Sequence, residues 1–327
     1  MHGLKELKEV RFNETEVLLK DSRVKSPILP EKRDQMNRTV TIQGNTVVEG
    51  AVYAHRLEIQ SGDAEFMGAV FANLELHINT DAAGKIIFRK AVGSADTIVS
   101  RAKNANLLFA NDINAKKVTL YNAFVAGSIY ADDIVLENSV VIGGVFATQK
   151  IDMKDSIAGT FNGTSVSISS FAGLLLPSAF SIEKLYAAPE TLFYNYSLAD
   201  LGALYKRLPQ SPNSGKIKMN IEAVEIKTTL STEEYQKTLL SYTVIGKVLA
   251  VDLLDTDKFQ NHFLLTAASL NSQLLRVYDF GRDANGNPIE LSLEKIKDFF
   301  FDLLHGRIEI QEMDGNFDIK QLTKEFA

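Results

Sequence analysis

Small and apolar residues in the middle of the chain recur at a fixed interval. Gly127, Gly143 and Gly159 stand 16 residues apart. Two residues after each glycine comes a large apolar residue, and two residues later a small one. With one earlier copy, these two sets are Ile113, Ile129, Val145 and Phe161, and Ala115, Ala131, Ala147 and Gly163. Because all three sets of residues recur at the same interval, each copy is predicted to be one structural unit of a repeat fold.

Each copy continues into a segment whose apolar residues fall at every second position, as at Val118 and Leu120 or at Val166 and Ile168. A period of two is typical of a β-strand. A unit this short cannot bury its own apolar residues, so the copies are expected to stack, with each strand parallel to its equivalent in the next unit. The sequence therefore predicts a short-rung parallel β-helix (solenoid), with small residues at its tight corners.

Earlier copies follow a looser spacing. Gly50 and Gly68 each open a similar unit, 18 residues apart. Between about His77 and Asn106 the phase is lost although apolar positions continue, which favours longer corner loops over a break. About nine rungs fit between residues 39 and 188, and at roughly 4.8 Å per rung they would form a rod on the order of 45 Å long.

The two flanking regions differ from the repeats. Residues 1–38 mix both signs of charge and are predicted to be a mobile or loosely docked tail. Residues 189–327 carry helix-start patterns and are predicted to form a smaller α+β domain that folds by itself. Its expected helices start at Ser197 and Ser231, cover 259–274 and run from Ser292 to Leu304, with strands at 217–226, 274–280 and 307–311. The fold class expected for the whole chain is mainly β.

The central repeats, between residues 40 and 168, resemble the bactofilins, which are bacterial polymer-forming cytoskeletal proteins. A step of Gly-x-Val/Ile-x-Ala and a following apolar triplet carry the resemblance, at Gly50, Gly68, Gly127 and Gly143 and at Ala54, Ala72, Ala131 and Ala147. The resemblance implies a compact β-helix that joins end to end into filaments without nucleotide, often near a membrane through an N-terminal tail. The long region after Ala188 departs from that family, and a folded domain there would cap one end of the coil.

Composition narrows the classes of partner. A net charge of -6 and a pI near 5.5 argue against a surface that binds nucleic acid. The absence of cysteine excludes disulfides and thiolate metal sites. Neither a secretory h-region nor an apolar stretch of about 20 residues is visible, so a cytoplasmic location is expected, with membrane association through the tail left open.

Histidines are the first candidates for catalysis. An acyltransferase built on hexapeptide repeats needs a period that is a multiple of six and a histidine base, whereas the interval here is 16 residues. His55 and His77 lie in the repeats beside polar residues, which favours outward positions. A zinc site of three imidazoles would need His262 or His305 from the C-terminal region, and no spacing recommends it.

Acidic residues give two further patterns. Asp132 and Asp133, and Asp152 with Asp155, are candidate carboxylate pairs, but neighbours on a strand point to opposite sides. Asp283, Asn285, Asn287 and Glu294 have the spacing of the oxygen-bearing ligands in a calcium-binding loop. Pro288 stands where the loop needs glycine, so a turn is favoured and no cofactor or metal is expected.

The run from Phe299 to Phe301 cannot lie on one side of a helix. Packing within a core is favoured over docking on a partner.

The function expected from these patterns is a non-enzymatic scaffold that self-associates through its solenoid ends. The contact is predicted at the first rung, through Val40, Ile42, Val47 and Val52. The expected partners are further copies of the chain, other proteins through the C-terminal domain, and a membrane surface through the tail. The alternatives are a solenoid enzyme that transfers acyl or sugar groups and a capped solenoid adaptor that binds protein partners.

Overall fold

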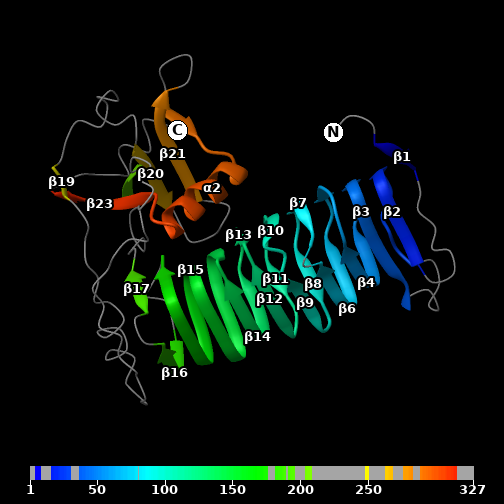
Figure 1. Cartoon of the computed structure of the whole chain (residues 1–327), viewed down its shortest axis with the longest axis horizontal. Coiled ribbons are helices and arrows are strands. Elements are labelled where there is room, and N and C mark those ends of the chain that lie inside the picture. Colours follow the sequence, from blue (N-terminus) through cyan, green and yellow to red (C-terminus); the bar gives the residue numbers. More distant parts are fainter. Residues whose placement is uncertain are drawn as a thin grey trace.

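Each repeat of the sequence forms one coil of a parallel β-solenoid in the computed structural model (Figure 1). The structure describes residues 4–8, 16–30, 37–79, 81–175, 181–188, 191–195, 203–207, 247–249, 262–267, 275–282 and 288–314. The predicted fold class is confirmed: the protein is mainly β, and the solenoid is followed by a smaller C-terminal part with a helix.

Short strands build the solenoid and a separate sheet follows it. The solenoid strands are β1 (Lys5–Leu7), β2 (Glu16–Val24), β3 (Thr39–Val48), β4 (Val52–Ile59), β5 (Ala64–Phe66), β6 (Val70–Ile78), β7 (Ala83–Phe88), β8 (Val92–Ser94), β9 (Thr97–Ser100), β10 (Asn104–Phe109), β11 (Ile113–Asn114), β12 (Lys117–Tyr121), β13 (Ala123–Val125), β14 (Ile129–Glu137), β15 (Val140–Leu174), β16 (Ser181–Ala187) and β17 (Leu192–Asn195). The C-terminal module comprises β18 (Ala203–Arg207), β19 (Lys247–Leu249), β20 (His262–Ala267), β21 (Leu275–Arg282), β22 (Pro288–Glu290), α2 (Leu293–Leu304) and β23 (Ile308–Asp314).

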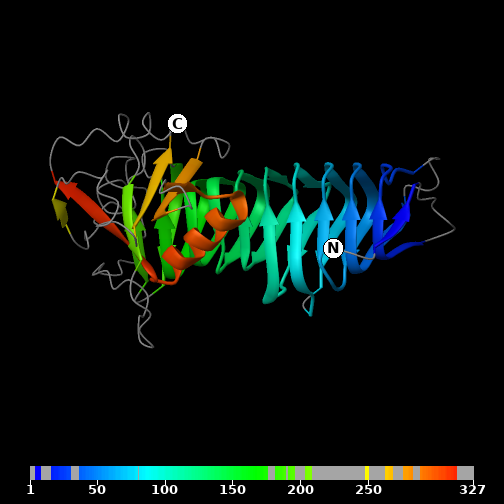
Figure 2. The ribbon, with the colours of Figure 1, turned by 90° about the horizontal axis from the view of Figure 1, so that it is seen from above.

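Each turn of the chain visits three faces in the same order, and every strand pairs in parallel with its equivalent in the next coil (Figure 2). Face A carries segments 39–43, 56–59, 75–78, 97–100, 117–121, 133–137 and 150–154. Face B carries 46–48, 64–66, 86–88, 107–109, 123–125 and 140–141. Face C carries 52–54, 70–72, 92–94, 113–114, 129–130 and 145–147.

The predicted register of the repeats is confirmed. Ile129 is opposite Ile113 on one side and Val145 on the other, and all three side chains are fully buried. The stretch where the spacing is lost is also part of the coil, because β7 pairs with β10 and β9 with β12. Inside face B, the rings of Phe66, Phe88 and Phe109 stack at centroid distances of 4.9 and 4.8 Å. This spacing equals the separation of neighbouring strands.

Two kinds of corner explain the small residues. Between faces B and C, a Cβ on Gly127 would be 2.6 Å from the carbonyl carbon of Asn111, so only glycine fits against the preceding coil. At the corner between faces A and B, Asn122 and Asn138 have a left-handed backbone with φ near +50°. Asparagine tolerates this backbone better than most residues, and the Asn138 side chain donates to Asn122 Oδ1 of the coil before it.

The predicted boundary at residue 38 is wrong for the described part of the N-terminal region. Strand β2 pairs in parallel with β3 from Glu16 opposite Thr39 to Val24 opposite Val48, and β1 pairs with the end of β2. The segment looks polar because its outward side is charged, whereas Val17 and Leu19 alternate with those residues and point into the coil.

The C-terminal predictions have mixed outcomes. Helix α2 begins after Ser292, whose hydroxyl accepts from the Lys295 backbone N–H, and strands β21 and β23 also lie where strands are expected. The helix expected over 259–274 is wrong, since β20 occupies 262–267, and Leu204 lies in β18 rather than in a helix. The segment after Ser231 and the strand at 217–226 lie outside the described residues.

Candidate functional site

The residues predicted to form the self-association contact lie one coil inside the solenoid. Val40 is opposite Val17, Ile42 opposite Leu19 and Val47 opposite Arg23, all in β2. Val40 and Ile42 are fully buried, and Val52 is bridged to Ile28. These four positions are therefore wrong as an end surface, because β2 covers the coil to which they belong.

The N-terminal end of the described solenoid is formed by β1 and the first half of β2. On face A, an outward-facing residue donates its backbone N–H to the preceding coil, as Gln60 does to the Ile42 carbonyl at 2.9 Å and Asn79 to that of Ile59 at 2.9 Å. Leu18 is an outward-facing residue at the equivalent alternation of β2, since it lies opposite Thr41, which lies opposite Glu58, and its side chain is 55% exposed. Its N–H therefore points to a side on which the described residues place no strand.

The interior of this terminal coil is apolar. Val17 and Leu19 are buried, and Leu7 of β1 packs partly buried against the same core. An ion pair of 3.0 Å between Lys25 and Glu6 links β1 to the chain beyond β2. The end thus combines outward-directed backbone groups with an apolar layer directly behind them, which is the arrangement that accepts another strand.

From the coil of Ile87 onward, face B is apolar on its outer side as well. Its outward residues form one buried cluster with α2: Ile87, Leu108, Phe124, Val140, Ile157 and Phe171 from the coils, and Ile296, Phe299, Phe300, Leu303 and Leu304 from the helix. The Phe124 and Phe300 rings are 6.2 Å apart. Figures 1 and 2 show α2 lying on the solenoid toward its C-terminal end. The phenylalanine run, for which core packing is favoured from the sequence, thus packs on the solenoid itself.

Polar contacts hold both ends of α2. At its start, Arg89 binds Glu294 at 2.9 Å and Glu65 at 2.8 Å. Burial opposes ionisation of Glu294, but hydrogen bonds from its own backbone N–H and from Arg89, together with the charges of Arg89 and Lys85, leave its pKa below the ordinary value. At the other end, His305 Nε2 lies 2.9 Å from Asn138 Oδ1.

A lysine lies within the covered surface. Lys297 is 9% exposed, and its Nζ is 4.7 Å from the centre of the Phe301 ring. Burial lowers the pKa of Lys297. The ring face offsets part of the desolvation of the ammonium group.

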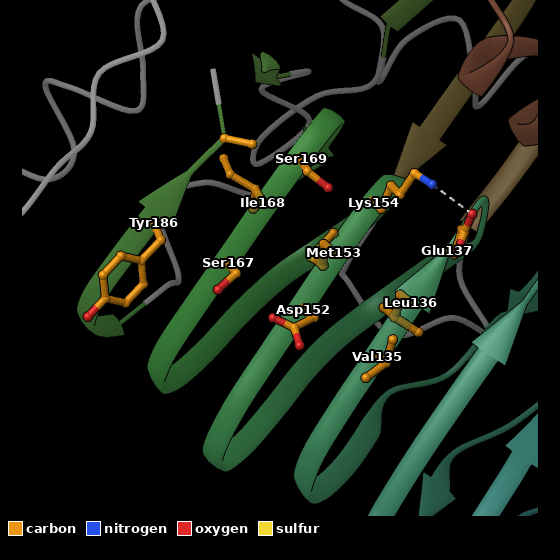
Figure 3. Close-up of a pocket in the computed structure, with 11 residues that line it drawn as sticks. Val135, Leu136, Glu137, Asp152, Met153, Lys154, Ser167, Ile168, Ser169 and Tyr186 are labelled. Atoms are coloured by element: carbon orange, nitrogen blue, oxygen red, sulfur yellow. Dashed lines mark hydrogen bonds and ion pairs between the residues drawn. The ribbon is translucent and has the colours of Figure 1, made fainter. Parts of the chain in front are cut away.

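Face A carries a shallow groove of about 420 Å³ between its C-terminal coils (Figure 3). Val135, Asp152, Ser167 and Tyr186 line it from successive coils, and Glu137 pairs with Lys154 at 3.0 Å on its rim. Asp152 pairs with Lys150 at 2.8 Å. Because each carboxylate has its own cation, Glu137 and Asp152 do not form the coupled carboxylate pair that a glycosidase uses, and the floor of the groove is mainly apolar.

The structure does not bring the histidines together. His55 contacts Asn73, His77 is on face A and His305 contacts Asn138. His262 lies in β20 of the C-terminal module. Across the described ranges, no three or more His, Asp or Glu side chains are grouped to hold a metal ion.

The candidate carboxylates are separate too. Asp132 accepts a hydrogen bond from Thr148 at 2.5 Å, while Asp133 opens a segment of face A. Glu294, the last residue of the calcium-like pattern, binds Arg89, and residues 283–287 lie outside the described residues.

A scan of protein-family models, a search of curated proteins and a search of solved structures each found no match to this chain. In the part of the chain that the structure describes, no helix has the length and apolar character needed to cross a membrane.

Proposed function

We propose that this protein is a structural scaffold that self-associates through the N-terminal end of its solenoid, as its resemblance to the bactofilins implies. The observation that carries the proposal is the edge formed by β1 and the first half of β2. Among the described residues, the ladder of coils ends there with backbone groups directed away from β3, above the apolar residues Val17 and Leu19. A parallel coil that ends in this way is a template for another strand.

The geometry of the contact decides what assembles. Two N-terminal ends that meet about a two-fold axis give a closed dimer, whereas an N-terminal end on the opposite end of the next copy gives an open filament. In both cases the outward N–H groups of β2, including that of Leu18, become donors across the contact.

The test is the substitution Leu18→Pro. Proline removes the outward N–H of Leu18 and leaves the bonds to β3, which belong to the residues of the other phase. We expect negative-stain microscopy and light scattering to show the assemblies of the wild-type chain shortened or lost in Leu18→Pro. Leu18→Thr, which keeps the N–H and a strand-forming side chain, is the matched control and is expected to assemble.

A thermal melt followed by circular dichroism checks that Leu18→Pro stays folded. Wild-type assembly in a folded Leu18→Pro variant, or a wild-type chain that is monomeric at high concentration, would contradict the proposal.

A further inference from the structure

The groove on face A runs along the solenoid axis and crosses four successive coils (Figure 3). Two columns of outward side chains form its sides, and the columns are two residues apart on each strand, or roughly 6.7 Å. Three steps between coils give the groove a length of roughly 14 Å. One column consists of Val135, Asp152, Ser167 and Tyr186, and the other of Glu137, Lys154, Ser169 and Ala188. The groove is therefore long and narrow, and it suits a linear ligand.

Polar groups on both sides of the groove are open to a ligand. The hydroxyls of Ser167 and Ser169 have no hydrogen-bond partner within the described part of the chain. Lys150 Nζ binds Oδ2 of Asp152 at 2.8 Å, and Oδ1 of that carboxylate is unpaired among the same residues. Asp152 and Ser167 are in one column and Ser169 is in the other. These groups can therefore bind the two opposite edges of one ligand.

The aromatic ring of Tyr186 has a face that is free to stack. Tyr186 is 41% exposed, and it contacts no other ring and no cation among the residues that the structure describes. The rings on face C differ, because Tyr130 stacks on Phe146 at 5.1 Å and each ring covers one face of its neighbour. The groove thus combines an uncovered ring at its C-terminal end with a lining that is mainly apolar.

The charges around the groove cancel. Glu137 is paired with Lys154 at 3.0 Å, and Asp152 is paired with Lys150. An anion would lie beside both carboxylates and a cation beside both ammonium groups, so neither gains from the site. A neutral ligand with apolar faces and polar edges fits the lining and the open polar groups together. Sugar rings have this character, since their C–H groups form the faces and their hydroxyls lie at the edges.

The spacing of the coils favours a linear, β-linked chain of sugars. Equivalent side chains recur at about 4.8 Å along the groove, whereas an extended peptide on the same line would advance by about 3.3 Å per residue and lose register with them. A β-1,4-linked sugar chain advances by close to one coil step per sugar, so it keeps register over the length of the groove. Its alternate sugars are turned over, and polar groups on both sides of the groove can bind their hydroxyls in either orientation.

We propose that this groove binds a single β-1,4-linked glycan chain, which lies along the solenoid axis with one sugar stacked on Tyr186. The site is on a face of the solenoid rather than at its end, so the inference does not depend on the proposed self-association. With such a site, the protein is a scaffold that attaches to a polysaccharide.

The test uses cellotetraose and chitotetraose as β-1,4-linked probes and maltotetraose, the α-1,4-linked isomer of cellotetraose, as the control. Saturation-transfer NMR with the full-length chain is expected to show binding of a β-linked probe and none of maltotetraose, because the α-linkage curls the chain out of register with the coils. Tyr186→Ala should weaken the binding by about tenfold or more. Tyr130→Ala, which removes a tyrosine of similar exposure from face C, should leave the binding unchanged.

A second pair of variants checks where the chain lies. Ser167→Arg fills the middle of the groove and should abolish binding. Thr97→Arg, at an outward position of face A two coils before the groove, is the matched control and should bind as the wild-type chain does. A thermal melt followed by circular dichroism checks that each variant is folded.

Three outcomes would overturn the glycan site: no binding of either β-linked probe, equal binding of cellotetraose and maltotetraose, or the same affinity in the folded variants Tyr186→Ala and Tyr130→Ala. Leu18→Pro is expected to bind the probes as the wild-type chain does. Loss of assembly and loss of sugar binding are therefore measured separately, and either proposal can fail without the other.

Discussion

The sequence predicts the orientation of a side chain best at positions where an apolar residue recurs in every copy of the repeat. Ile129 and Val145 are assigned to equivalent inward positions from the interval of the glycines alone, and they lie opposite each other in neighbouring coils. The interval carries this information where successive coils have equal length, as from Ile113 to Ile129 and Val145. A longer coil, such as the one from Val70 to Val92, keeps the ladder but hides the interval. The left-handed corner at Asn122 and Asn138 is harder to recognise, because asparagine is equally common in ordinary turns.

Ile129→Asp tests the interior at this scale. The carboxylate would be buried between Ile113 and Val145 without a cation, so we expect a loss of several kcal/mol in the free energy of unfolding, measured by urea denaturation. Asn114→Asp changes an exposed residue next to an inward one and should change the midpoint little. Equal midpoints for both variants and the wild-type chain would mean that Ile129 does not face the interior.

At the scale of elements, the sequence predicts strands and corners better than it predicts what covers them. Face A alternates apolar and polar residues, as a half-solvated sheet should, whereas face B has three apolar residues in succession at 86–88, 107–109 and 123–125. Such runs indicate strands that are buried on both sides. The runs indicate that another element covers face B, but they do not identify that element. Helix α2 is far from face B in the sequence, so no short-range sequence pattern links the two.

The docking of α2 should depend on pH through Glu294. Its folded pKa lies below the ordinary value of 4.5, so its contribution to stability is present above that value and is lost as the pH falls through the lower folded pKa. We expect Glu294→Gln to lower the urea midpoint at pH 7 and to lower it by less near pH 3, where the loss of charge on Glu294 has begun to weaken the wild-type contact. Asp298→Asn, on the exposed side of the same helix, is the control. A difference of the same size at both pH values would contradict this role for the carboxylate.

For the whole molecule, three faces of one coil have three different environments. Face A is charged, face B is covered by α2 from the coil of Ile87 onward, and face C carries two stacked pairs of aromatic side chains. The solenoid itself follows from the repeat, but the assignment of residues 1–38 to a tail fails because charged residues on the outward side of β2, such as Lys20, hide the apolar alternation of Val17 and Leu19. The expected helix near Leu204 fails because helix-start patterns such as Ser-x-x-Asp also occur ahead of strands. The helix over 259–274 was expected from the spacing of its apolar residues, and a few spaced apolar residues such as Phe263 also fit a strand, here β20.

Deleting residues 189–327 tests the dependence of the solenoid on its C-terminal module. The deletion uncovers Leu108, Phe124 and Val140 on face B, so we expect the truncated chain to bind the dye ANS strongly and to aggregate without order. The full-length chain is the reference. Ordered, longer filaments from the truncated chain, without dye binding, would instead indicate that the module acts as a cap on growth.

The two polar contacts of α2 have a consequence for how the repeat can change in length. Glu294 and His305 are separated by a rigid helical span of about 16 Å, and they bind Arg89 and Asn138, which lie roughly three coil steps apart. Inserting or deleting one coil between those residues would shift one contact by about 4.8 Å and break it. Coils before Arg89 carry no such constraint from α2. The solenoid can therefore gain or lose whole repeats on its N-terminal side, while the helix fixes their number beneath it.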